Sequence, residues 1–309
     1  MGTITRCNAI LLLGLTILAT SAGGQQTERS TRTILVAGAT GTQGGAVARE
    51  LNRRGYRVRG LTRDPTSERA LALVALGIEM VRGDFDDAAS LDAALQNAYG
   101  AFSVQQYRGL DAGGELRHGR AFADAAERTG VQHFVYTSVA KARLNTGVPQ
   151  YDSKVPIEDH IRAIGIAYTI IRPSTFMTWI DAHREDILAG FFSAPFPPEK
   201  QRVYISPGDI GRFAAEAFDD PLSWVGKELS IGGERISSTA IAEVLSRVTG
   251  RTVVYRQMPW EEFAASAPPN VLASSTWYMT GNDPMDLDAL RQEFPWLRTF
   301  ERYLIETGW

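Results

Sequence analysis

The chain has 309 residues, of which 44% are hydrophobic and 22% are charged, a balance typical of one large α/β domain, alone or with a small appended lobe. A formal net charge of −3 gives no electrostatic basis for binding nucleic acid, so we expect no nucleic-acid partner. The only cysteine, Cys7, excludes a disulfide framework, and the four histidines lack H-x-x-x-H spacing, so we predict no metal site.

Residues 1–26 resemble a secretory signal rather than part of a fold. Residues 10–19 form an apolar run of the length of a signal-peptide core, too short to span a bilayer, and small residues follow at 20–22. This pattern predicts export and no membrane span in the mature chain. The alternatives are an uncleaved anchor or a misassigned start, and with a misassigned start the protein would be cytoplasmic.

A glycine-rich turn follows the first predicted strand. Residues 34–37 are apolar, Gly38, Gly41 and Gly44 have the spacing G-x-x-G-x-x-G, and a helix ending at Gly55 comes next. Such a turn brings the free N–H groups of a helix start against a pyrophosphate. The pattern favours a dinucleotide site over an ordinary glycine-rich turn.

The second predicted strand, residues 56–61, indicates which dinucleotide binds. Sites for NAD carry an acidic residue at this strand end, whereas NADP sites carry a basic residue that meets the 2′-phosphate. Here Arg63 follows the strand, and Asp64 precedes Pro65 as in a turn. We therefore predict that NADP(H) is preferred over NAD(H), unless Arg63 is only a solvated loop charge.

The alternation of strands and helices continues through the first half of the chain. Asp84 and Phe85 follow a strand at 78–81 and are placed to meet the adenine, and the acidic pair after them suits a helix N-cap. The pattern predicts an α/β fold with a doubly wound parallel sheet. Its other expected elements are helices at 67–76, 86–95 and 115–129 and strands at 101–104 and 133–138.

A second group of residues surrounds the helix predicted at 151–164. Ser138 ends the fifth strand, and Lys154 lies on the helix that follows, as in short-chain dehydrogenases, where a Tyr four residues before the Lys donates a proton. In this chain Gln150 holds that position and Tyr151 lies at a spacing of three, about 100° away around a helix. We retain Lys154 and Tyr151 as candidate catalytic residues; the alternative for Lys154 is a solvated helix lysine. The chain has only four lysines, among them Lys141 and Lys154.

The pattern loosens after the sixth predicted strand, residues 167–171. We expect helices at 175–189, 210–218 and 238–249, strands at 228–231 and 253–257, and a loop over a pocket at 191–198. Further helical segments are expected from 258, at 285–294 and at 296–309. The aromatic residues of this half are expected to pack the core and the lobe: Trp260, Trp277, Tyr278, Trp296 and Trp309.

The motifs together resemble the NmrA-like family of atypical short-chain dehydrogenases. They are GATGTQGGAV at 38–47, LTRDP at 61–65, RGDFDD at 82–87, HFVYTSVA at 133–140, DSK at 152–154, IRPSTFM at 171–177 and MPWEEF at 258–263. The resemblance implies an NADP-binding domain over residues 33–309, with a Rossmann part at about 33–175 and a small C-terminal α+β substrate lobe built mainly from 176–309. The cofactor contacts it implies are Gly38, Ala39, Thr40, Gly41, Thr42, Gln43, Gly44, Arg63, Asp84, Phe85, Gln105, Gln106, Tyr107, Arg117, Ser138, Lys154 and Phe176.

The resemblance leaves two functions open. Some members of the family reduce quinones, ethers or carbonyl compounds, whereas others act as NADP(H) sensors that bind a regulatory protein. The family often has Asn near the nicotinamide where this chain has Trp179. We favour a reductase of a small quinone, enone or carbonyl substrate, with a redox sensor as the alternative, and a homodimer stays open.

Overall fold

A computed structural model describes residues 28–107, 112–281 and 283–309. The signal-like segment, residues 1–26, lies outside this range. Within the described residues, no helix has the length and apolarity needed to cross a membrane.

The central element is a seven-stranded sheet in the order β10-β6-β5-β4-β1-β2-β3. Every neighbouring pair runs parallel, as the Rossmann prediction requires. The doubly wound parallel sheet expected from the sequence is therefore confirmed. Its strands are β1 (Thr33–Val36), β2 (Arg57–Thr62), β3 (Glu79–Arg82), β4 (Gly100–Ser103), β5 (His133–Thr137), β6 (Tyr168–Pro173) and β10 (Glu228–Ile231).

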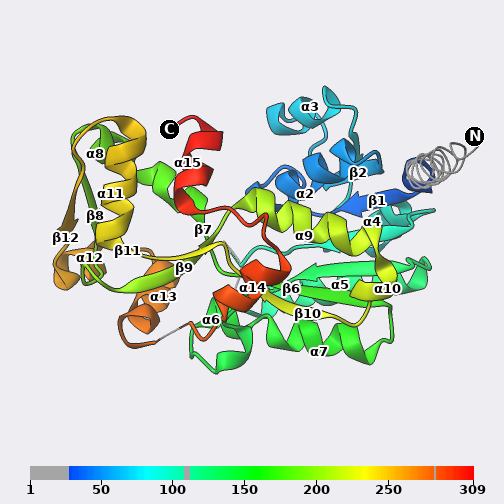
Figure 1. Ribbon diagram of the computed structural model, residues 1–309. Coiled ribbons are helices and arrows are strands. Elements are labelled where there is room, and N and C mark those ends of the chain that lie inside the picture. Colours follow the sequence, from blue (N-terminus) through cyan, green and yellow to red (C-terminus); the bar gives the residue numbers. More distant parts are fainter. Residues whose placement is uncertain (1–27, 108–111, 282) are drawn as a thin grey trace, which may run out of the picture.

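Helices cover both faces of this sheet because each face is apolar (Figure 1). On one face lie α2 (Thr42–Arg53) and α9 (Pro207–Asp219), which meet so closely that a Cβ on Gly211 would lie 2.8 Å from the Ala46 carbonyl oxygen. The other face carries α4 (Ala88–Leu95), α5 (Ala112–Arg128) and α7 (Val155–Ala163). The remaining helices around the sheet are α3 (Glu68–Val74), α10 (Pro221–Trp224) and α14 (Leu287–Glu293), with η1 (Ala142–Leu144) and α6 (Pro149–Asp152) before α7.

A smaller lobe with its own core extends from one end of the sheet (Figure 1). It holds a three-stranded sheet of β11 (Glu234–Ser237), β9 (Gln201–Ile205) and β7 (Thr175–Phe176), and a strand pair of β12 (Val254–Gln257) and β8 (Phe191–Ala194). Its helices are η2 (Met177–His183), α8 (Arg184–Leu188), α11 (Ser238–Thr249), α12 (Trp260–Ser266), α13 (Pro269–Thr280) and α15 (Phe300–Thr307). The C-terminal α+β lobe expected from the sequence is present.

Several details differ from the sequence-based expectation. Residues 191–198 were expected to form a loop, but 191–194 form β8, because Phe191 to Ala194 pair with Val254 to Gln257. The expected helix at 175–189 begins with the short strand β7, which pairs with β9. Finally, α9 and β10 return from the second half of the chain to the central sheet.

Candidate active site

The site lies where the strand order of the central sheet reverses. Strands β1 and β4 are neighbours, and the chain leaves them toward opposite sides, to β2 and β3 in one direction and to β5, β6 and β10 in the other. In open parallel sheets, ligands bind in the crevice outside the carboxyl ends of the strands at this reversal. The glycine turn follows β1 there, and Gln105 lies just beyond β4.

The glycine turn has the geometry of a phosphate cradle. Gly38 has φ of +61°, a left-handed value that favours glycine, and a Cβ on Gly44 would lie 2.6 Å from the Ala37 carbonyl oxygen. No side chain caps α2 at Gly41. Within the described residues, no acceptor faces the N–H groups of Thr42, Gln43 and Gly44. These donors at the positive end of a helix are therefore available to an anion.

Gly44→Ala is expected to lower the free energy of unfolding by about 1–3 kcal/mol, because the new methyl group must displace the backbone of Ala37 and Gly38, which follow β1. Binding of NADPH should weaken in parallel. Both are measurable by urea denaturation and by fluorescence titration. Arg53→Ala, at the exposed far end of the same helix, is the control and should change stability by about 1 kcal/mol or less. A Gly44→Ala protein as stable as the wild type would contradict this account of the turn.

The residues around the cradle differ in exposure. Gln43 is buried and donates a hydrogen bond to the Thr137 hydroxyl at the end of β5, which ties the helix start to a strand two places from β1 in the sheet. Ala39 is buried in the core, Thr40 is half-buried and Thr42 is exposed. Gln43 and Ala39 therefore shape the turn, whereas the Thr42 side chain is open to solvent.

Arg63 and Asp64 follow β2 and have different surroundings. Arg63 is exposed and has neither an ion-pair nor a hydrogen-bond partner among the described residues. Asp64 accepts hydrogen bonds from the Thr66 hydroxyl and, at 2.9 Å, from the Thr66 N–H, and these bonds lower the pKa of its carboxyl group. Asp64 is thus held in a local turn, and the guanidinium of Arg63 is free to meet an anion.

The segment after β3 shows both structural and ligand-facing character. Asp84 is half-buried and accepts from the Asp86 N–H, and Phe85 packs against His118 and Phe122 at centroid distances of 5.4 and 5.7 Å. Asp87 caps α4, accepting from Ser90 as the expected N-cap. Arg117, an implied cofactor contact, instead forms an exposed ion pair with Asp86 at 3.0 Å.

Gln105 provides a polar group that lacks a partner. Its side chain is buried and donates to Ser103 at 3.0 Å, but its Oε1 atom has no hydrogen-bond partner among the described residues. A buried acceptor without a partner costs about 1–3 kcal/mol, which a bound ligand would recover. Gln106 beside it is exposed, and Tyr107 is half-buried at the end of the described stretch.

Lys154 is buried and paired, rather than solvated. It lies between α6 and α7, and its ammonium forms an ion pair with Glu115 of α5, whose carboxylate is fully buried. The Ser153 hydroxyl donates to the other oxygen of Glu115, and the Lys154 Nζ atom also lies 3.5 Å from the Gln105 carbonyl oxygen. The ion pair therefore fixes the Lys154 ammonium at the carboxyl end of β4.

Tyr151 faces a different lysine. The Lys141 Nζ atom lies 5.9 Å from the centre of the Tyr151 ring and 5.0 Å from that of Tyr278, and it forms an ion pair with Asp283 at 3.0 Å. Burial raises the pKa of Tyr151 to about 12, although Lys141 acts in the opposite direction. Burial alone would lower the pKa of Lys141, but Tyr278 and Asp283 raise it above its usual value. Tyr151 and Lys154 thus have separate sets of neighbours.

Ser138 and Phe176 complete the set of predicted residues. Ser138 is buried at the end of β5, and Phe176 is half-buried in β7. Beside Ser138, the buried carboxylate of Glu158 accepts two hydrogen bonds from Arg172, each 2.7 Å long. Burial acts to raise the pKa of Glu158, but Arg172 and Ser138 outweigh it and lower the pKa.

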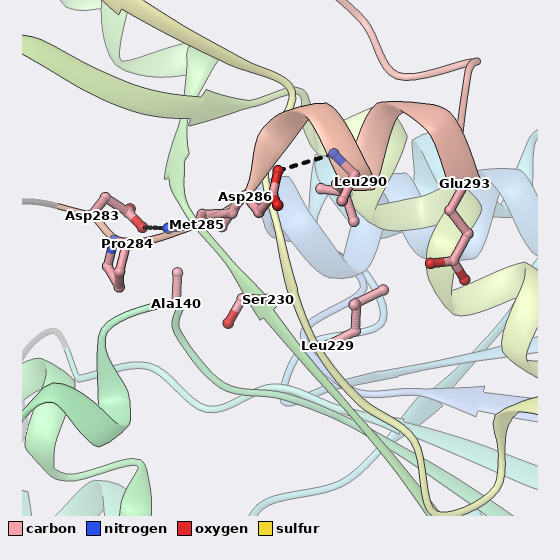
Figure 2. A pocket seen from close by; sticks show the side chains of 10 residues that line it. Ala140, Leu229, Ser230, Asp283, Pro284, Met285, Asp286, Leu290 and Glu293 are labelled. Atoms are coloured by element: carbon pink, nitrogen blue, oxygen red, sulfur yellow. Dashed lines mark hydrogen bonds between the residues drawn. The ribbon is translucent and has the colours of Figure 1, made fainter.

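A hollow of about 370 Å³ lies between the end of the central sheet and α14 (Figure 2). Ala140 and two residues of β10 line one side, and the segment from Asp283 to Glu293 lines the other. Asp283 is common to the hollow and to the ion pair with Lys141. In the part of the chain that the structure describes, no group of acidic, histidine or cysteine side chains could hold a metal ion.

Glu115 and Arg202 were not anticipated from the sequence. Glu115 is an ordinary helix residue in the pattern, 39 positions from the lysine it binds. Arg202 lies on a strand that the pattern did not predict. Only the scarcity of lysine in the chain drew attention to Lys141 in the sequence.

Comparison with known proteins supports the fold and the relationship. The profile of the NmrA-like family matches residues 30–283. An NmrA-like domain-containing protein of Dictyostelium discoideum is 27% identical over 75% of this chain and 82% of its own length. The NmrA-like oxidoreductase FrzB of Cladobotryum sp is 28% identical, with 77% and 80% covered. The nitrogen metabolite repression protein of Emericella nidulans is 26% identical, with 77% and 71% covered.

Two solved structures share the architecture. The triphenylmethane reductase of Citrobacter sp., complexed with NADP(H), has a TM-score of 0.76 at 21% identity and covers 89% of this chain and 99% of its own. The NADPH-dependent quinone oxidoreductase of Escherichia coli, complexed with NADPH, has a TM-score of 0.73 at 22% identity, with 89% and 99% covered. At these identities the similarity shows the fold.

Proposed function

Because the chain belongs to the NmrA-like family, we propose that it is an NADPH-dependent oxidoreductase that reduces a small quinone, enone or carbonyl compound. Relatives described as oxidoreductases and neighbours that bind NADP(H) support this proposal. The alternative is a redox-sensing regulator, which the relationship to a repression protein supports.

The main support for a nicotinamide cofactor is the set of unsatisfied polar groups where the strand order reverses. The N–H groups at the start of α2 lack acceptors, and the buried Oε1 atom of Gln105 lacks a donor among the described residues. A pyrophosphate fits the first set, because it brings negative charge to a helix N-terminus. A hydrogen-bond donor of the ligand would satisfy the second.

The preference for NADP(H) over NAD(H) rests on Arg63. A free guanidinium can bind the 2′-phosphate through two parallel hydrogen bonds, and Asp64 is already held by Thr66. A charged hydrogen bond contributes about 1.5–3 kcal/mol. We therefore expect Arg63→Ala to weaken NADPH binding by roughly 10- to 100-fold and to leave NADH binding unchanged.

The matched control for Arg63→Ala is Arg57→Ala. Arg57 is also exposed, but it is the first residue of β2 and therefore lies at the amino end of the strand, far from the carboxyl ends where the site is. Titration of both variants with NADPH and NADH separates the two positions. If Arg63→Ala keeps the full preference for NADPH, this arginine does not select the cofactor.

The residues of the site have separate roles in the proposed reduction. The bound cofactor supplies hydride. The Lys154 ammonium, fixed by Glu115, donates hydrogen bonds at the end of β4, where the nicotinamide ribose is expected. The Tyr151 phenol is protonated at neutral pH because its pKa is about 12, and it can donate its proton to the substrate oxygen. Lys141 then stabilises the phenolate, since its ammonium faces the ring.

A further inference from the structure

Arg202 of β9 lies among four aromatic side chains in the lobe. Its guanidinium carbon is 4.0 Å from the ring centre of Phe196, 5.0 Å from that of Tyr204, 5.2 Å from that of Tyr278 and 5.7 Å from that of Trp179. Phe196, Tyr204 and Tyr278 are buried, and Arg202 itself is half-buried. We call this group the Arg202 cage.

The guanidinium in this cage lacks a negatively charged partner. Its Nε and Nη2 atoms both donate to the single hydroxyl oxygen of Tyr204, and no carboxylate of the described residues pairs with it. By contrast, the partly buried Arg54, Arg172 and Arg298 all bind carboxylates. A guanidinium has five N–H donors, so three of those on Arg202 have no acceptor among the residues that the structure describes.

Donors on two members of the cage are unsatisfied among the described residues. The Nη1 atom of Arg202 has no hydrogen-bond partner among the described residues and is not fully buried. The Nε1 atom of Trp179 is closed off, and its N–H donor also lacks a partner among the described residues. Cation–π contacts hold the arginine in place, but they leave its in-plane donors unused.

The cage is continuous with the proposed active site. The Tyr278 hydroxyl lies 2.9 Å from the Thr175 hydroxyl, next to Phe176 in β7, and Thr175 pairs in register with Tyr204. The ring of Tyr278 also contacts Lys141, which in turn faces Tyr151. Tyr278 therefore links the Arg202 cage to Lys141 and, through it, to the proposed proton donor Tyr151.

The structure assigns to Arg202 the recognition of a carboxylate on the substrate. This inference rests on the proposed function, because it takes that substrate to be the compound that is reduced. A carboxylate matches the planar fork of a guanidinium, and the aromatic rings suit a flat conjugated body. The substrate class is thus an aromatic or conjugated carboxylic acid with a reducible enone, quinone or carbonyl group. Lys141 already pairs with Asp283 and faces the proposed proton donor Tyr151, so the carboxylate is assigned to Arg202, which has no carboxylate partner among the described residues.

Binding of matched acids and esters to the full-length protein tests this assignment. The protein is saturated with NADP⁺, so that no turnover occurs, and titrated calorimetrically with benzoate, cinnamate and 3-benzoylacrylate and with their methyl esters. We expect the acids to bind at least about 10-fold more tightly than their esters, and Arg202→Met to weaken acid binding by roughly 10- to 100-fold. Ester binding should not change.

Arg202→Lys keeps the charge without the planar fork and should give an intermediate affinity. Arg247→Met, on the outer side of α11, where Arg247 pairs with Glu301, is the control and should bind like the wild type. Equal affinity of the wild type for acids and esters throughout the panel would overturn the assignment, and this comparison needs no variant. Acid binding through Arg202 without any NADPH oxidation would overturn the reductase proposal alone.

Discussion

Replacing Lys154 with methionine is expected to reduce substrate-dependent NADPH oxidation by about 10²-fold, because loss of a contact that positions the cofactor can cost that much rate. The reason is its fixed place: Glu115 holds the ammonium at the end of β4, beside the Gln105 carbonyl. Methionine keeps the unbranched stem of the side chain, one atom shorter, and removes the charge and the donors. Separate measurements of turnover and of NADPH affinity show whether Lys154 supports the reaction or the binding of the cofactor.

Loss of Lys154 also leaves the buried carboxylate of Glu115 without its partner, which by itself destabilises a protein. The double variant Lys154→Met with Glu115→Gln removes both charges and should recover stability without recovering turnover. Tyr151→Phe should lower turnover with little effect on NADPH affinity, because Tyr151 faces Lys141 instead. A Lys154→Met protein with full rate and full affinity would remove Lys154 from the site.

The second large effect is expected on stability, at Glu158. This buried carboxylate binds Arg172 of β6 through two hydrogen bonds and also pairs with Arg143 and Arg162. Removing one partner of a buried charge pair costs about 3–5 kcal/mol. For Glu158→Gln we expect about 3 kcal/mol, since Arg172 keeps its contact with Glu228. Urea denaturation at neutral pH measures this difference.

The effect of Glu158 should depend on pH. Its folded-state pKa lies below the ordinary value of 4.5, so the carboxylate contributes its stability above pH 4.5 and loses it as the pH falls through the folded pKa. The stability difference between wild type and Glu158→Gln should therefore shrink in acid. Asp159→Asn, at an exposed position of the same network, should change stability by about 1 kcal/mol or less. Equal effects of the two substitutions would contradict this account.

The sequence was sufficient for the Rossmann part of the fold, because its strands and helices follow one another locally. The apolar run before Gly38, the glycine spacing and the stop at Gly55 all lie within one strand–turn–helix unit. The strands of the lobe could not be predicted in this way. Strand β7 has two residues, and β8 exists only because it pairs with β12, about sixty residues later.

The same physical limit applies to the site. Residues on the glycine turn and after β2 could be proposed from adjacent sequence, and they stay predictions for cofactor binding. The partners that give Lys154 and Tyr151 their environments come from distant elements, namely Glu115 on α5 and Lys141 before η1. Spacing alone could show that Tyr151 is displaced from the usual position, but not which lysine it would face.

The measurement that tests the proposed reductase most directly follows NADPH binding and NADPH oxidation in one preparation of the purified protein. Quinones, enones and aldehydes, each with and without a carboxylate, are added to the protein–NADPH complex, and absorbance reports oxidation. We expect tight binding and oxidation with at least one compound, fastest among those that carry the acid. Tight NADPH binding with no oxidation by any compound would contradict the reductase and favour the redox sensor.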